Sequence, residues 1–209
     1  MRLRPAIARL LAPLTRLVTR RLPARDAWER YDYSVPLSAF GSGNRHEFGW
    51  YFEGESSVTV ASLDEVQEWL LACEYVQDET LFHEPDYWQH PHTFEQLRRG
   101  DCEDHALWAW RKLVELGYDA DLVSGTVLQG SEETVERGGH VWVLLHANGE
   151  RLVFEAVAKA KSRMVRPLAE VRDRYRPEFG VDRRRQRYAF NGALLAFNES
   201  RAPSTKRSA

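Results

Sequence analysis

The chain has 209 residues, of which 29 are lysine or arginine and 31 are aspartate or glutamate, and its formal net charge is −2. This balance lacks the basic excess of nucleic-acid-binding proteins, so no nucleic-acid partner is expected. The length suits one domain with extensions. The two cysteines are too few for a disulfide framework, which favours a reducing, cytoplasmic location.

Residues 1–25 differ from the rest of the chain, because they contain seven arginines and no acidic residue. Arg9, Pro13 and Arg16 interrupt their apolar residues, so the segment fits neither a secretory signal nor a membrane span of about 20 apolar residues. Two interpretations remain open. The segment is either a basic amphipathic helix that contacts an anionic membrane or a partner, or a flexible arm.

The main domain is placed at residues 26–197, and a polar tail at 198–209 is expected to be disordered. At the start of this domain, residues 30–60 are expected to be extended. Ser62, with Glu65 three residues later, predicts a helix that runs to about residue 76, because this pair is typical of a helix N-terminus.

The most informative segment reads Gly-Asp-Cys-Glu-Asp-His-Ala over residues 100–106. Apolar residues recur after it at helical spacing, which predicts a helix over 102–116 that begins at Cys102. The unpaired N–H groups and the positive dipole end of a helix N-terminus favour a thiolate, the nucleophilic form of cysteine. Asp101 and Glu103 act against a thiolate, so a protonated histidine or a cation must offset their charge.

Asn148 and Gly149 lie between two apolar runs and predict a β-hairpin over residues 138–157. Counting outward from this two-residue turn, His140 and Glu155 are diagonal neighbours on one face of the hairpin. One hairpin then holds a base and the carboxylate that orients it. A cysteine helix packed against that face would complete the nucleophile, base and orienting acid of acyl transfer.

The remaining pattern places a short helix at 93–98, a strand at 121–128 and a polar loop at 130–138. A short helix is expected over 167–176, and an aromatic strand or helix over 183–196. Helices followed by antiparallel strands predict an α+β fold.

Each candidate also has a purely structural interpretation. Cys102 can be an inert thiol at the start of a buried helix, and His140 or Glu155 can be an ordinary strand residue. Two other histidines compete for the role of the base. His105 follows the cysteine on the same predicted helix, and His146 lies beside the hairpin turn.

Three parts of the chain resemble the bacterial transglutaminase-like cysteine peptidases, a family of the papain-like and transglutaminase-like superfamily. They are residues 87–93 with 99–104, 139–143 and 154–157. With the segments between them, the resemblance covers about residues 62–195. It implies a papain-like α+β core in which the nucleophile helix packs on an antiparallel sheet.

The resemblance also implies the roles of four residues. Cys102 corresponds to the nucleophile and His140 to the base, while Glu155 stands where the family usually has an orienting aspartate. The longer glutamate changes the geometry of that contact. Trp88 resembles an aromatic residue that lines the family's cleft, and Trp142 is expected to form a second wall.

No cofactor is required for this chemistry, but Asp101 and Glu103 match positions that help to bind calcium in periplasmic members of the family. The implied function is a thiol hydrolase that cleaves a peptide or isopeptide bond in a protein or peptide substrate. Two alternatives remain open. One is transfer of the acyl group to an amine, and the other is an inactive module that binds a peptide in the same cleft.

Overall fold

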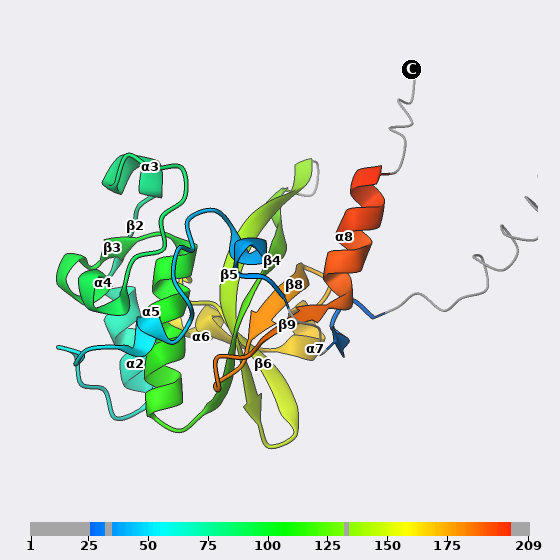
Figure 1. Cartoon of the computed structure of the whole chain (residues 1–209). Helices are drawn as coiled ribbons and strands as arrows, with labels where there is room; N and C mark the ends of the chain where they lie inside the picture. The colour runs from blue at the N-terminus through cyan, green and yellow to red at the C-terminus, as the bar shows by residue number, and fades with distance from the viewer. Residues whose placement is uncertain (1–25, 32–34, 132–133, 202–209) are drawn as a thin grey trace, which may run out of the picture.

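The computed structural model describes residues 26–31, 35–131 and 134–201 of the chain (Figure 1). The N-terminal arm expected at residues 1–25 lies outside the described residues. None of the described helices is long and apolar enough to cross a membrane.

The described part of the chain mixes short helices with a large antiparallel sheet. Its helices are η1 (Leu37–Phe40), η2 (Trp50–Phe52), α2 (Leu63–Leu71), α3 (Asp78–Leu81), α4 (Pro91–Leu97), α5 (Cys102–Glu115), α6 (Lys161–Met164), α7 (Leu168–Val171) and α8 (Asn191–Arg201). Its strands are β1 (Arg30–Tyr31), β2 (Glu74–Tyr75), β3 (Arg99–Gly100), β4 (Asp119–Ser131), β5 (Thr134–Ala147), β6 (Glu150–Phe154), β7 (Val165–Pro167), β8 (Tyr175–Val181) and β9 (Arg187–Phe190).

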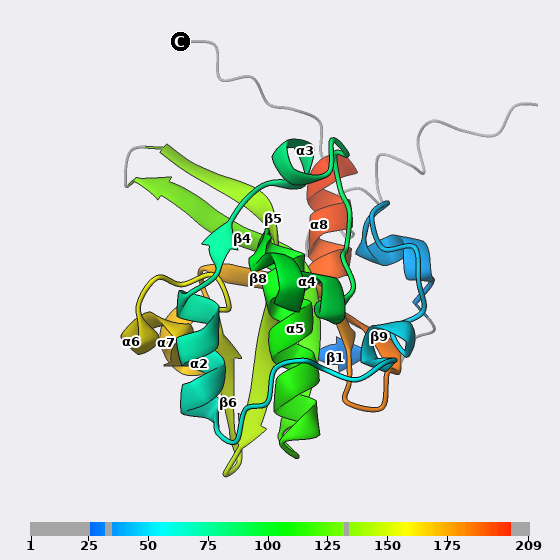
Figure 2. The same ribbon diagram turned by 90° about the vertical axis from the view of Figure 1, so that its left-hand side faces the viewer.

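Seven strands form the main sheet in the order β1-β9-β8-β4-β5-β6-β7, and every pair of neighbours is antiparallel. Strands β2 and β3 form a separate parallel pair just before α5. Helices α2, α4 and α5 gather on one side of the sheet (Figures 1 and 2). The nucleophile candidate at the start of α5 is therefore held between a small parallel ribbon and the main sheet.

Several predicted element ends differ from the observed ones. The helix opened by Ser62, whose hydroxyl accepts the Glu65 N–H at 3.2 Å, ends at Leu71 rather than near residue 76. The chain leaves it there because Glu74 pairs with β3. Of the extended run expected over residues 30–60, the described residues include the short strand β1, and two 3-10 helices, η1 and η2, interrupt the rest. At the other end, α8 continues past residue 198 to its last residue, Arg201.

The expected polar loop at 130–138 is largely strand instead. β4 and β5 pair continuously from Asp119 with His146 to Ser131 with Thr134. The far end of this hairpin extends away from the rest of the sheet (Figure 2). The prediction was wrong because it took polar composition as a sign of a loop, while a hairpin that projects from the domain needs no apolar face.

The predicted hairpin between β5 and β6 is confirmed, including its register. Ala147 pairs with Glu150 and Val143 pairs with Phe154. Asn148 and Gly149 form the turn with φ values of 51° and 81°. Both angles lie in the left-handed region that this two-residue turn requires, and asparagine and glycine adopt it most readily.

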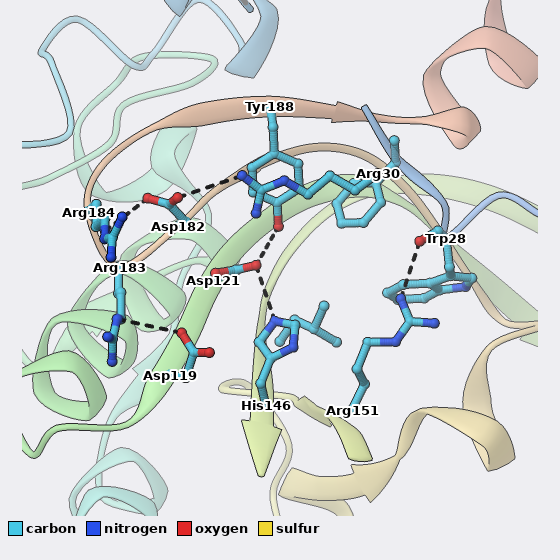
Figure 3. A pocket seen from close by; sticks show the side chains of 12 residues that line it. Trp28, Arg30, Asp119, Asp121, His146, Arg151, Asp182, Arg183, Arg184 and Tyr188 are labelled. Carbon is cyan, nitrogen blue, oxygen red and sulfur yellow. Dashed lines mark hydrogen bonds and ion pairs between the residues drawn. The ribbon is translucent and has the colours of Figure 1, made fainter. Parts of the chain in front are cut away.

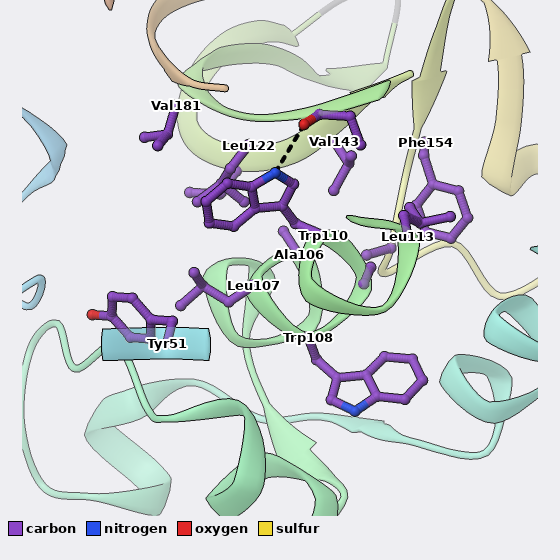
Figure 4. Close-up of a cluster of buried hydrophobic side chains, with 14 of the residues drawn as sticks. Tyr51, Ala106, Leu107, Trp108, Trp110, Leu113, Leu122, Val143, Phe154 and Val181 are labelled. Carbon is purple, nitrogen blue, oxygen red and sulfur yellow. Dashed lines mark hydrogen bonds between the residues drawn. The ribbon is translucent and has the colours of Figure 1, made fainter. Parts of the chain in front are cut away.

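Helix α5 packs on the sheet through a fully buried apolar surface (Figure 4). Ala106, Trp110 and Leu113 have no exposed surface and belong to one hydrophobic cluster with Val143 and Phe154 of the hairpin. A 14-residue helix that buries this much apolar surface derives most of its stability from tertiary packing rather than from helix propensity.

A second, smaller hydrophobic cluster lies on the other face of the sheet. It contains Trp28, Trp142, Leu144, Tyr188 and Phe190. Successive residues of a strand point to opposite faces, and so Val143 and its neighbours Trp142 and Leu144 belong to different clusters. The expected α+β class, with the cysteine helix packed on an antiparallel sheet, is confirmed.

Candidate active site

The start of α5 is anchored by a buried carboxylate. Cys102 is the first residue of the helix. The Asp104 carboxylate, 1% exposed, accepts the backbone N–H of Asp101 at 3.3 Å and that of Gln89 at 2.9 Å. The Gln89 side chain donates to the same carboxylate at 2.5 Å. These bonds fix the N-terminus of α5 against the segment that contains Trp88.

The expected contact between His140 and Glu155 is present. The imidazole Nε2 lies 2.8 Å from Oε2 of Glu155. The Tyr175 hydroxyl donates to the same oxygen at 2.9 Å. The Glu155 backbone is held as well, because its N–H donates to the Met164 carbonyl at 2.7 Å. With Nε2 engaged by the carboxylate, Nδ1 is the ring nitrogen left to face a nucleophile.

Sequence reasoning missed Tyr175, which lies on β8 and far from the hairpin in the chain. Its ring meets Trp142 edge-on at 5.1 Å between centroids, and Trp142 stacks on His140 at 6.0 Å. The two aromatic rings therefore support the imidazole while the Tyr175 hydroxyl supports its carboxylate. No local motif identifies such a residue.

Cys102 and His140 line the same cavity, which has a volume of about 450 Å³. Trp88 lines it too, as expected, and is 4% exposed. A methyl group placed on Gly139 would meet nothing within 4 Å, so the strand leaves open space beside the imidazole. The cavity volume of about 450 Å³ falls within the usual range for ligand cavities.

Trp142 does not line this cavity, contrary to the expectation that it forms a second wall. It is fully buried in the cluster on the other face of the sheet. Alternation along β5 explains this position, because α5 packs against the face of Val141 and Val143 while His140 stacks on Trp142. The cysteine helix thus packs on the hairpin face opposite the His–Glu pair, not on the same face as expected. Cys102, at the start of its helix, shares a cavity with His140.

The Cys102 thiol is not held as a thiolate. It donates to Oε2 of Glu103 at 3.2 Å and accepts the backbone N–H of Val141. Burial raises its pKa well above the usual value, and the charges of Glu103 and Asp101 raise it further. Burial and the two carboxylates therefore outweigh the helix terminus, so a thiolate still requires the cation or protonated histidine that offsets their charge. Among the described residues, no hydrogen bond joins this thiol to His140.

A cluster of carboxylates surrounds the same cysteine. Three overlapping groups each bring their ligand atoms within 4.8 Å of one another, and the groups are drawn from Asp78, Asp86, Asp101, Cys102, Glu103 and Asp104. Asp78 is the first residue of α3 and Asp86 lies between α3 and α4, and neither carries a motif that would have identified it. Sequence reasoning predicted only the members next to the cysteine.

The cluster fits a calcium ion by its chemistry. Calcium prefers carboxylate oxygens. One oxygen each of Asp78 and Asp101 is buried without a hydrogen-bond partner among the described residues. Burial raises the pKa of Asp78 to about 6, and burial together with neighbouring carboxylates raises the pKa of Glu103 well above its usual value. Both shifts are the response of crowded carboxylates that lack a positive partner.

The two competing histidines have other partners. His105 is fully buried, and its Nδ1 lies 2.7 Å from the Asp101 carbonyl oxygen. Burial lowers its pKa to about 4. His146 lies 3.2 Å from Asp121 and borders a different cavity. Of the three histidines, only His140 lines the cavity of Cys102.

No protein-family model matches the chain, and no curated protein sequence matches it. Among solved structures, Legionella pneumophila LapG aligns with a TM-score of 0.45 and 17% identity, over 73% of this chain and 82% of LapG. The EGTA-treated form of LapG aligns with a TM-score of 0.42 and 18% identity, over 64% of this chain and 69% of LapG. Similarity at this level assigns no function to the chain.

Proposed function

We propose that this protein is a transglutaminase-like thiol hydrolase that cleaves a peptide or isopeptide bond with Cys102 as nucleophile, His140 as base and Glu155 as the residue that orients the base. The observation that carries the proposal is the 2.8 Å contact between His140 and Glu155 beside the cavity that Cys102 lines. A histidine oriented by a carboxylate next to a cysteine at a helix start is the arrangement that acyl transfer requires.

In the proposed reaction, Nδ1 of His140 takes the proton of the Cys102 thiol as the sulfur attacks the carbonyl carbon of the substrate. Backbone N–H groups at the start of α5 stabilise the resulting oxyanion. His140 then gives its proton to the amine, which leaves as the C–N bond breaks and a thioester remains. Water attacks the thioester, His140 takes a proton from it, and the carboxylic acid leaves as the thiol is restored.

Glu155 stabilises the imidazolium that forms in both steps, and it holds the ring with Nδ1 toward the cavity. Tyr175 supports this by donating to the same oxygen of Glu155. This second donor offers a physical reason why a glutamate serves where a shorter aspartate is usual. A carboxylate anchored by two partners keeps its orientation in spite of the additional rotatable bond.

A calcium ion is part of the proposal, with Asp78, Asp86, Asp101 and Glu103 as the residues that would hold it. When bound, the ion supplies positive charge that offsets these carboxylates. The thiol of Cys102 then loses the negative neighbours that raise its pKa. If the Glu103 carboxylate binds the ion, it no longer accepts the thiol hydrogen, and the thiol can donate to His140 instead.

A second candidate function, an inactive peptide-binding module, is favoured by one observation. The thiol donates to Glu103 and its pKa is raised, which suits an inert cysteine. Acyl transfer to an amine remains the enzymatic alternative, since it shares every step up to the thioester.

The test is mass spectrometry after brief iodoacetamide treatment, with calcium or with EGTA. The buried Cys73, whose pKa is raised to about 12, serves as an internal reference. The proposal expects calcium to accelerate labelling of Cys102 alone. His140→Ala should abolish that acceleration because the base is lost, and Asp78→Asn should abolish it because a calcium ligand is lost.

Slow and equal labelling of both cysteines under all conditions would contradict the enzyme and support the binding module. If Cys102 is reactive, incubation with a peptide pool and a dansylated primary amine separates the two reactions. Shortened peptides indicate hydrolysis, and a dansylated product indicates transfer. Cys102→Ser should abolish either product.

A further inference from the structure

A second cavity, of about 320 Å³, lies on the sheet face opposite α5 (Figure 3). The residues around it include Trp28, Arg30, His146, Arg151 and Tyr188. None of these side chains takes part in the proposed hydrolysis. We propose that this cavity binds a small anionic ligand in which a phosphate or carboxylate group is attached to a flat apolar group.

The apolar group would meet an aromatic wall. Trp28, Tyr188 and Phe190 are each at most 3% exposed and line the cavity. Phe190 meets the other two rings edge-on, at 6.0 Å from Trp28 and 5.1 Å from Tyr188. Leu144, 1% exposed, completes the apolar lining. Rings that hold one another in place give the cavity a preformed apolar lining.

The charged group would meet guanidinium groups that come from separate elements. Arg30 of β1 lies over the Tyr188 ring at 3.7 Å from its centroid, and Arg151 comes from β6. Arg183 and Arg184, from the connection between β8 and β9, lie at another side of the cavity (Figure 3). A guanidinium presents planar paired donors that match the oxygens of a carboxylate or phosphate.

The carboxylates at this cavity already have partners. Asp121 is 4% exposed, accepts the Tyr188 hydroxyl at 2.6 Å and lies 3.2 Å from His146. Asp182 lies 3.6 Å from Arg30, and Asp119 lies 3.7 Å from Arg183. Each carboxylate is thus held by a hydrogen bond or an ion pair, and the four arginines of the lining outnumber its three aspartates.

Among the described arginines that line the cavity, Arg151 and Arg184 form no ion pair with its aspartates, and Arg151 lies beside the aromatic wall. One of its terminal nitrogens donates to the Trp28 carbonyl at 3.2 Å. Within the described part of the chain, no carboxylate lies within ion-pair distance of it. A guanidinium has five N–H donors, so a single bond to a neutral carbonyl leaves charge and donors for a ligand. The net positive charge of the lining, together with its aromatic wall, defines the ligand class.

The size of the cavity limits the ligand further. About 320 Å³ is at the lower end of the range for small-molecule sites, which suits a single ring with one anionic group rather than a peptide. Phosphate and carboxylate share the chemistry that the arginines recognise, and matched probes distinguish them.

The test is isothermal titration calorimetry of the full chain with phenyl phosphate, benzoate, inorganic phosphate and neutral benzyl alcohol. We expect saturable binding of phenyl phosphate or benzoate, weaker binding of inorganic phosphate and none of benzyl alcohol. Arg151→Gln should weaken binding by roughly tenfold or more, because a charged hydrogen-bonding partner is lost. Arg166→Gln, at an exposed pair with Glu170, is the matched control and should bind as the wild type does.

A lack of saturable binding by every probe would overturn the proposal, and so would an unchanged affinity in a folded Arg151→Gln variant. If that variant does not fold, Arg184→Gln at the exposed side of the cavity decides instead, with a several-fold loss expected. Cys102→Ala should leave binding unchanged, so this result is independent of whether the protein is a hydrolase.

Discussion

The thiol of Cys102 donates its hydrogen to the carboxyl group of Glu103, with 3.2 Å between sulfur and Oε2. Glu103 is 5% exposed, and burial raises the pKa of both groups well above their usual values. A partly buried thiol beside negative charge stays protonated and reacts slowly. This contact therefore holds the cysteine in a protonated resting form.

Replacing the charge next to the thiol tests this resting form directly. Glu103→Gln should lower the pKa of Cys102, because it removes the nearest negative charge and an acceptor of the thiol hydrogen. At neutral pH, each unit by which the pKa falls raises the thiolate fraction about tenfold. The measurement is the alkylation rate of Cys102 against pH, with EGTA present.

Glu115→Gln, at the other end of α5, is the matched control and should leave this rate unchanged. An unchanged or slower rate in Glu103→Gln would show that the carboxyl group does not hold the thiol in its resting form.

The Tyr175 hydroxyl is expected to act through Glu155 rather than on a substrate. Tyr175→Phe removes one of the two hydrogen bonds to Oε2 and leaves the ring packed on Trp142. We expect a loss of about tenfold in the His140-dependent alkylation of Cys102, the equivalent of one hydrogen bond. Tyr118→Phe, outside this site, serves as the control. Equal alkylation rates in the two variants would show that the Tyr175 hydroxyl does not support Glu155.

A substitution at Gly100 tests how closely the residues around the start of α5 are packed. A methyl group at this position would overlap the Asp104 carboxylate and the Gln89 amide. Gly100→Ala should therefore lower the free energy of unfolding by about 1–3 kcal/mol, the usual cost of overpacking, and slow the alkylation of Cys102. Gly49→Ala, where nothing lies within 4 Å, should be close to neutral in urea denaturation. A stable Gly100→Ala would contradict the observed packing.

His105 predicts a pH dependence of stability. Burial lowers its pKa from 6.5 to about 4 in the folded chain. Between these values the unfolded chain binds a proton that the folded chain does not, so the free energy of unfolding falls as the pH falls. Between pH 6.5 and about 4, the free energy of unfolding falls by about 3 kcal/mol in total. Above pH 6.5 this histidine causes no loss of stability.

The measurement is urea denaturation at several pH values for the wild type and His105→Asn. The raised pKa values of Asp78 and Glu103 act in the opposite direction, since a folded chain that binds more protons gains stability as the pH falls. The difference between wild type and variant isolates the histidine. The variant should lack the loss at low pH, while His83→Asn, at an exposed position, should retain it.

Local sequence was sufficient for much of the site. The Asn148-Gly149 turn specifies the register of the hairpin, and strand alternation then places His140 and Glu155 on one face. The start of α5 at Cys102 was likewise predictable from helical periodicity and from the acidic residues around it. Each of these features depends on residues that are close in the chain.

Tertiary structure alone decided the rest. Tyr175 reaches Glu155 only because β8 lies in the same sheet, and Asp78 reaches Glu103 only because the fold brings the first residue of α3 to the start of α5. The sheet face on which α5 packs was decided by the burial of its apolar surface. The raised thiol pKa depends on the fold as well, since the sequence shows which charges are near a cysteine but not how much water the fold removes.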